Sequence, residues 1–241
     1  MNSNRKVSGT GILVGLLLSV TCASQQQKKA FLYFVDYSRS ASSLVGANRG
    51  KVNDLVDKVL SNLQAEDLLA VYPIHAYTAS ATPILRLSGP KLLGDLRDRQ
   101  RQKSWQREFA SPAVDGIWKA RFRKDRTSWT NIYPIVRKIA SSVKTGYKVR
   151  AFIICDMIQD ANGEDFSKMF GNNSDADPIR YARRKVSELG FDGILEGVEI
   201  MIKMPGSPQG IKKYDHIRPK VNAFWEEFYS TCGARVTIED L

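Results

Sequence analysis

Carboxylate and hydroxyl side chains follow two apolar stretches of the chain. Asp36 comes directly after the apolar run 30–35, and Ser38 and Ser40 stand two and four residues further on. Asp156 directly follows a second apolar run. Oxygen ligands of this kind suit a hard cation such as Mg²⁺, which keeps several waters and takes octahedral geometry. The residue types therefore predict a cation site that needs neither histidine nor thiolate.

The elements that would position these side chains alternate between strand and helix. Apolar runs predict strands at about residues 30–35, 68–74, 82–87, 149–155, 198–202 and 234–238. Apolar residues at three-and-four spacing predict helices at about residues 52–63, 132–143, 179–189 and 217–228. This order predicts a doubly wound α/β fold with a mostly parallel six-stranded sheet, helices on both faces and one short antiparallel edge strand.

The two aspartates lie where such a fold binds its ligands. In open α/β sheets, ligands bind outside the carboxyl ends of the strands, where the strand order reverses. Asp36 and Asp156 both follow predicted strands, and Thr130 stands just before the predicted helix 132–143. We expect these three side chains to meet at one edge of the sheet.

This pattern resembles a known family. Asp36-x-Ser38-x-Ser40 directly after an apolar strand is similar to the metal-ion-dependent adhesion site of von Willebrand factor type A (VWA) domains. That family adds a threonine from a loop before a central helix and an aspartate after the next strand, and Thr130 and Asp156 occur in that order. The resemblance covers essentially all of the chain beyond its first 28 residues.

The resemblance implies a role for each of the five residues. Ser38 and Ser40 would coordinate Mg²⁺, or alternatively Mn²⁺ or Ca²⁺, through their hydroxyls, and Thr130 directly or through water. Asp36 and Asp156 would hold coordinating waters. An acidic side chain of a protein partner would take the remaining position, so the resemblance implies a binding module and no enzyme.

The chain departs from the family pattern in two places, and one of its positions has two candidates. The domain expected at 29–241 contains a basic insertion at about 91–126, which lengthens the interval before the threonine. Met157 stands where the family usually has glycine. Thr127 competes with Thr130 for the threonine position, and Thr130 is preferred because the apolar helical pattern follows it in phase.

The basic insertion contains eleven basic and five acidic residues. One interpretation is a solvated helix and loop, and a second is attraction to an anionic membrane surface. A third is nucleic-acid binding with Trp105, Trp118 and Trp129 as stacking groups, which export would disfavour. The alternative to a metal-dependent binding module is a metal-free scaffold that binds through this insertion. A metal-dependent hydrolase is the third hypothesis, and the sequence offers no general base for it beyond the aspartates.

The first residues predict a signal peptide at 1–22. Two basic residues precede the apolar stretch 11–18, and small residues follow it. The stretch around Cys22 resembles a lipobox, so Cys22 is a candidate for lipidation, while cleavage after Ala23 is the alternative. Because no later segment approaches the roughly 20 apolar residues of a membrane span, we expect an exported periplasmic or cell-surface protein without a transmembrane helix.

The overall composition sets further limits. The 241 residues carry a net charge of +11 and are 43% hydrophobic, which excludes disorder. The three cysteines exclude a disulfide framework; Cys155 is expected as a small buried residue, and its pairing with Cys232 stays open. The acidic residues in 160–165 lack the spacing of a calcium loop and predict a solvated loop.

Overall fold

The computed structural model describes residues 27–38, 48–91, 93–110, 112, 114–115, 118, 129–161, 163–171, 174–205 and 215–241. The expectations for the signal peptide, Ser40, Thr127 and much of the basic insertion lie outside these residues. Within the described ranges, no helix is long and apolar enough to cross a membrane.

Six strands form one mixed sheet in the order β3-β2-β1-β4-β7-β8. The strands are β1 (Lys29–Asp36), β2 (Leu68–Ile74), β3 (Leu85–Ser88), β4 (Lys148–Ile154), β7 (Glu199–Met204) and β8 (Arg235–Asp240). Only the edge strand β3 pairs antiparallel to its neighbour, while the other four pairings are parallel. This confirms the predicted sheet, including its antiparallel edge strand.

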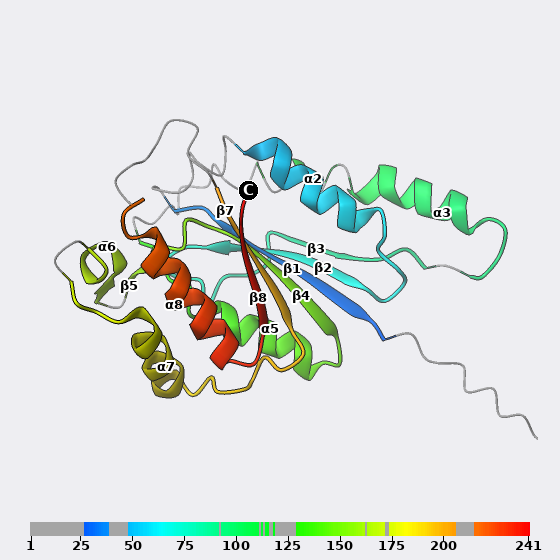
Figure 1. The fold of residues 1–241 in the computed structure, drawn as a ribbon. Helices are drawn as coiled ribbons and strands as arrows, with labels where there is room; N and C mark the ends of the chain where they lie inside the picture. Colours follow the sequence, from blue (N-terminus) through cyan, green and yellow to red (C-terminus); the bar gives the residue numbers. More distant parts are fainter. Residues whose placement is uncertain are drawn as a thin grey trace, which may run out of the picture.

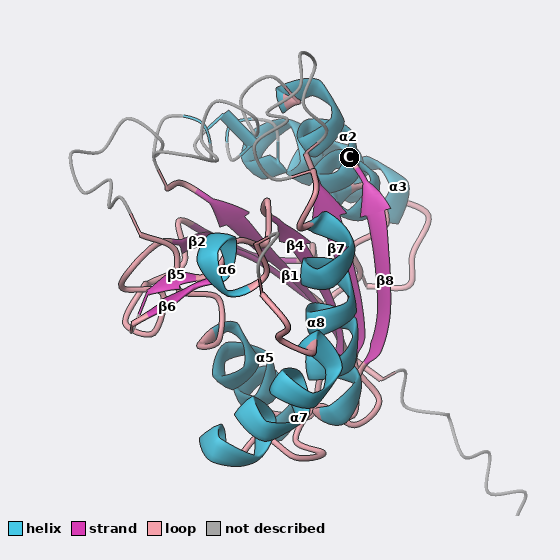
Figure 2. Ribbon diagram, turned by 60° about the vertical axis from the view of Figure 1, so that its left-hand side comes forward, coloured by secondary structure: helices cyan, strands magenta, loops and turns pink. Residues whose placement is uncertain are grey.

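Helices cover both faces of the sheet (Figure 1). They are α2 (Arg49–Leu60), α3 (Asp98–Trp105), the π-helical turn η1 (Gln106–Ala110), α5 (Ile135–Lys144), α6 (Phe166–Met169), α7 (Pro178–Leu189) and α8 (Arg218–Thr231). Figure 2 shows α2 and α3 on one side of the sheet and α5, α7 and α8 on the other. The structure is therefore doubly wound, as predicted.

Strand β1 is buried on both faces, which explains its unbroken apolar sequence. Successive side chains of a strand point to opposite faces. Leu32 and Phe34 pack into the core formed with α5, α7 and α8. Tyr33 and Val35 pack into the second core, formed with α2.

Helix α7 begins and ends as its sequence predicts. Asp177 caps it by accepting hydrogen bonds from the backbone N–H groups of Ile179 and Arg180. Pro178 occupies the first turn, where a missing N–H costs nothing. Gly190 ends the helix in the left-handed conformation, with φ of 67°.

Two local predictions need correction. Helix α5 begins at Ile135 rather than near Ile132, because the residue before a proline, here Tyr133 before Pro134, disfavours helical dihedral angles. The segment 160–165 contains a small hairpin of β5 (Asp160–Ala161) and β6 (Glu164–Asp165) instead of a loop, and α6 follows it directly.

Part of the basic insertion carries its own counter-charges. Residues 98–105 form α3, in which Arg101 makes ion pairs with Asp95 and Asp98, each at 2.7 Å. Five of its basic residues lie outside the described part of the chain. The interpretation of the whole insertion therefore stays a prediction.

Candidate metal site

The site lies where the parallel strands β1 and β4 end. These strands are neighbours in the middle of the sheet, and the chain continues from β1 to β2 on one side and from β4 to β7 on the other. This is a topological switch point, where open α/β sheets bind ligands. We call this edge of the sheet, where β1, β2 and β4 end, the carboxyl edge.

Two carboxylates and a thiol meet at the carboxyl edge. Asp36 ends β1, and Cys155 and Asp156 directly follow β4. One potential ligand atom from each of these three residues lies within 4.8 Å of the other two. Asp36 is 1% exposed and Cys155 is fully buried, while Asp156 is partly exposed at the edge of the group.

Both oxygens of Asp36 accept hydrogen bonds. The backbone N–H of Ser38 donates to Oδ1 at 2.7 Å, and the Cys155 thiol donates to Oδ2 at 2.9 Å. The Ser38 hydroxyl also hydrogen bonds to this carboxylate. Asp156 is held in turn by the backbone N–H of Ile158, which donates to its Oδ1 at 3.0 Å. The local backbone thus fixes the orientation of both carboxylates.

Burial makes two negative charges unfavourable at this edge. Burial raises the pKa of Asp36, while the hydrogen bonds from Cys155 and Ser38 lower it in part. Burial and then the charge of Asp36 raise the pKa of Asp156 to about 7. Neither carboxylate forms an ion pair with a Lys, Arg or His in the described part of the chain. A cation would relieve this repulsion.

The thiol stays protonated beside these carboxylates. Burial, followed by the charges of Asp36 and Asp156, raises the pKa of Cys155 well above its ordinary value. Cys155 is therefore a hydrogen-bond donor to Asp36, and it is not needed as a ligand for a hard cation. It is also a free thiol, as is the buried Cys232, so no disulfide joins them.

The loop that carries Thr130 is hydrogen bonded to segments that follow β2 and β4. The N–H of Asn131 donates to the carbonyl of His75, directly after β2, and the carbonyl of Thr130 accepts from the N–H of Asp160, which follows β4. These two bonds tie the loop to the segments that follow β2 and β4, the two neighbours of β1 in the sheet. Thr130 itself is 3% exposed.

Gln159 holds this loop through two hydrogen bonds of its side chain. Its side chain is fully buried, its Oε1 accepts from the N–H of Ile132 at 2.8 Å, and its Nε2 donates to Oδ1 of Asn131 at 3.4 Å. The sequence analysis missed Gln159, since a single glutamine in a loop carries no pattern. It treated Cys155 only as a core residue, although its position next to Asp156 was a signal for the site.

Met157 adopts a left-handed backbone conformation, which glycine tolerates better than other residues do. Its φ is 62°, in the left-handed region that side chains disfavour. The indole N–H of Trp225 donates to its carbonyl at 2.8 Å, and its own N–H donates to Sγ of Cys155 at 3.2 Å. The Met157 side chain is 1% exposed and packs in the core. The departure from the family pattern therefore keeps the loop conformation that glycine favours.

Of the predicted ligands, the structure brings Asp36, Ser38 and Asp156 together, and hydrogen bonds tie the Thr130 loop to the segments after β2 and β4. Ser40 lies outside the described residues. The acidic residues of the β5–β6 hairpin have other roles: Glu164 accepts from the Tyr133 hydroxyl at 2.6 Å, and Asp165 caps α6. They are not part of the cluster.

Fold and geometry together define a doubly wound α/β protein with two adjacent carboxylates, one of them buried, at its switch point. The sequence matches no protein-family model, and no curated protein matches it. Among solved structures, it is similar to the human COPII-coat protein Sec24c, with 11% identity, a TM-score of 0.49, and coverage of 89% of this chain and 29% of that chain.

Two further solved structures are similar over comparable lengths. A von Willebrand factor type A protein from Catenulispora acidiphila has 12% identity and a TM-score of 0.40, with 88% of this chain and 39% of that chain covered. The manganese-loaded TRAP protein of Plasmodium vivax has 12% identity and a TM-score of 0.44, with 89% and 69% covered. The chain thus spans less than half of the first two proteins.

Proposed function

We propose that the chain is a VWA-type binding module that holds a divalent cation at the carboxyl edge and engages a protein partner through it. The cation would be Mg²⁺, or alternatively Mn²⁺ or Ca²⁺. Its ligands would be Asp36, Ser38, Ser40, Thr130 and Asp156, directly or through water.

The observation that carries this proposal is a pair of adjacent carboxylates, of which Asp36 is buried and Asp156 is partly exposed. Asp36 and Asp156 lie close together at the switch point without a basic partner among the described residues. Proteins rarely bury acidic groups unless these are paired or coordinate a metal. A divalent cation is the simplest counter-charge for two carboxylates.

The side chains present fit such a cation. The carboxylates of Asp36 and Asp156 and the Ser38 hydroxyl supply oxygen donors, the type that Mg²⁺ and Mn²⁺ prefer. The hydrogen bonds from Ser38 and Cys155 fix the Asp36 carboxylate and leave it lone pairs for coordinating waters. When bound, the cation would supply positive charge and an open coordination position.

The partner in this proposal presents an Asp or Glu side chain to that open position. Such a carboxylate completes the coordination of a hard cation and adds charge complementarity. We place the chain among binding modules rather than enzymes. We also propose that it acts outside the cytoplasm, at a cell surface or in a periplasm, on the basis of its first 22 residues.

Isothermal titration of the purified chain with Mg²⁺ and Mn²⁺ tests the ligand set. The Ser38→Ala, Ser40→Ala double variant removes two hydroxyl ligands, and we expect it to weaken binding at least tenfold. A matched control is the Ser141→Ala, Ser142→Ala double variant, which changes two hydroxyls on α5 and should bind as the wild type does. Full binding by the first variant would refute the assignment of the serines.

Partner engagement is tested with the cation present and absent. We expect a peptide library immobilised on beads to return acidic sequences in Mn²⁺ and to release them in chelator. Retention of the same sequences after chelation would contradict binding through the cation.

A further inference from the structure

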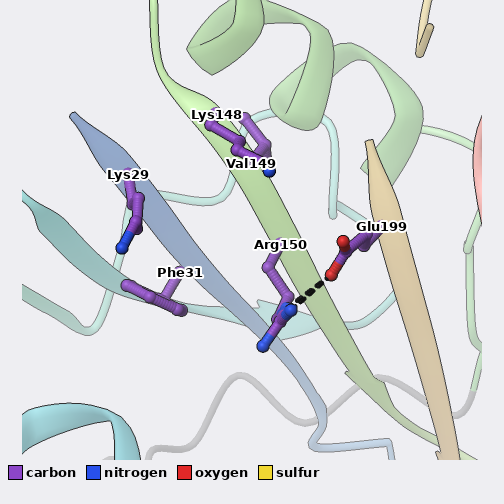
Figure 3. A pocket seen from close by; sticks show the side chains of 6 residues that line it. All are labelled: Lys29, Phe31, Lys148, Val149, Arg150 and Glu199. Carbon is purple, nitrogen blue, oxygen red and sulfur yellow. Dashed lines mark hydrogen bonds and ion pairs between the residues drawn. The ribbon is translucent and has the colours of Figure 1, made fainter. Parts of the chain in front are cut away.

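A pocket with positively charged walls lies at the opposite edge of the same sheet, where β1 and β4 begin. It has a volume of about 260 Å³ and is lined by Lys29, Phe31, Lys148, Val149, Arg150 and Glu199. Figure 3 shows these side chains on the neighbouring strands β1, β4 and β7. We call this edge the amino edge.

Two lysines stand opposite each other in this pocket. Lys29 and Lys148 are paired in the β1–β4 register, so neighbouring strands hold them side by side. Like charges directly opposite each other destabilise a sheet. Neither ammonium group forms an ion pair within the described part of the chain. This arrangement favours an anion between them.

An ion pair with Glu199 fixes the orientation of Arg150 in the same pocket. Arg150 pairs with Glu199 in the β4–β7 register, and both its Nε and its Nη2 contact Oε2 of Glu199, at 2.8 and 2.5 Å. The ion pair fixes the guanidinium plane and leaves its remaining N–H groups for a ligand. Figure 3 shows this contact between the two strands.

Positive charge outweighs the single carboxylate of Glu199. Its pKa is lowered by the hydrogen bond from Arg150 and then by the charges of Arg150, Lys148 and Arg235. Arg235 pairs with Glu199 from β8, so cations flank this carboxylate on both neighbouring strands. The pocket therefore has a positive potential that one ion pair does not neutralise.

The charged region ends sharply along the strands. On the same face, one step beyond Phe31 and Arg150, Tyr33 stacks on Phe152 with ring centroids 4.6 Å apart, and the helix-covered core begins there. Lys29, Lys148 and Arg150 remain exposed. Phe31 is half-buried and adds an apolar wall to the charged pocket.

We propose that this pocket binds a phosphate-type dianion, with Lys29, Lys148 and Arg150 as its ligands. Arginine contacts phosphate oxygens through two parallel N–H groups, while lysine acts as a mobile point charge. A phospholipid headgroup and a soluble phosphoester share this chemistry. The site is independent of the cation at the carboxyl edge.

Two binding measurements on the purified chain test this site, both in chelator so that the carboxyl edge does not contribute. The first titrates inorganic phosphate and follows the backbone amide signals of β1 and β4 by NMR. The second measures co-sedimentation with vesicles of phosphatidylcholine, either pure or in an equimolar mixture with phosphatidylglycerol. The variant is Lys29→Gln with Lys148→Gln.

The matched control removes the same charge elsewhere. Lys51 and Lys58 on α2 are exposed lysines outside both the pocket and the basic insertion, and both are changed to Gln. We expect the pocket variant to lose at least about tenfold in binding and the control to lose less than about twofold. Circular dichroism verifies that both variants remain folded.

The two measurements distinguish the source of the anion. Phosphate shifts without vesicle binding identify a soluble phosphoester, whereas additional binding to vesicles that contain phosphatidylglycerol identifies a headgroup. Either result supports the site when the pocket variant loses it. Equal loss in the pocket variant and the control, or no response to millimolar phosphate and to either vesicle, would overturn it.

Discussion

The neighbouring strands β1 and β4 carry a pair of like charges at each end, and the two pairs differ in burial. Asp36 and Asp156 lie at the carboxyl edge, where Asp36 is 1% exposed. Lys29 and Lys148 lie at the amino edge and are both exposed. Water screens the lysines, while the carboxylates repel each other in a medium of low dielectric constant. The comparison teaches that burial, rather than sequence spacing, decides how strongly the repulsion within a pair of like charges opposes folding.

Removing one charge from the buried pair should have the largest effect. At pH 8 in chelator, we expect Asp156→Asn to raise the free energy of unfolding by on the order of 2 kcal/mol, because a neutral side chain ends the repulsion with Asp36. The same variant should lose cation binding. Urea unfolding measures the first effect and titration calorimetry the second.

Asp160→Asn is the matched control for that variant. Asp160 is a half-buried aspartate four residues away, outside the cluster. We expect its substitution to change the unfolding free energy by less than about 0.5 kcal/mol. A destabilised Asp156→Asn protein at pH 8 would show that the two carboxylates do not oppose folding.

The pH dependence of stability provides the next test. Folding raises the pKa of Asp156 from 3.8 to about 7, so the folded state binds more protons than the unfolded state between these values. The contribution to stability is full below the lower value and is lost as the pH rises through the upper one. In chelator, the wild type should lose stability from pH 5 to pH 8 relative to the Asp36→Asn, Asp156→Asn double variant.

Mg²⁺ should abolish the loss of stability that the wild type shows between pH 5 and pH 8, and it should leave the stability of the double variant unchanged. Urea unfolding at pH 5 and pH 8, with chelator and with millimolar Mg²⁺, gives the four values required for each protein. A parallel pH dependence of wild type and double variant would contradict the raised pKa as its cause.

Gln159 tests how the carboxyl edge is positioned. We expect Gln159→Met to lower the free energy of unfolding by about 1 kcal/mol, because the buried N–H of Ile132 loses its acceptor. Cation affinity should also fall, since the Thr130 loop loses this support. Gln102→Met on α3 is the control, and unchanged affinity in Gln159→Met would show that the loop is held by other contacts.

The smallest effect is expected at the amino edge. Lys148→Gln should alter the free energy of unfolding by no more than about 0.5 kcal/mol in either direction, because the charge is exposed and screened. Urea unfolding at low and high salt measures it. A change as large as that for Asp156→Asn would mean that the two ends of the sheet do not differ as described.

The sequence predicts the fold well because its signals are local. The apolar run of β2 coincides with the strand at Leu68–Ile74, and the cap, proline and glycine of α7 coincide with its ends. The start of α5 was misplaced because Ile132 keeps the helical apolar phase, although Pro134 delays the helix. The hairpin of β5 and β6 was missed because strands of two residues carry no periodicity.

The candidate site could be predicted only in part. Asp36 and Asp156 were identified from their positions after apolar strands, which topology brings to one edge. The contribution of Gln159 depends on a tertiary contact with a loop 27 residues earlier in the chain, and no local pattern encodes that contact. The same holds for the lysines of the amino edge, which meet only through the register of β1 and β4.

Electron paramagnetic resonance of Mn²⁺ tests the central claim most directly, because the free ion gives a sharp signal that broadens on binding. The wild type and the Asp160→Asn control should each bind one Mn²⁺, displaced by excess Mg²⁺. The Asp36→Asn and Asp156→Asn variants should each leave the ion free. Equal binding by all four proteins, or none by the wild type at millimolar Mn²⁺, would contradict a cation site at the carboxyl edge.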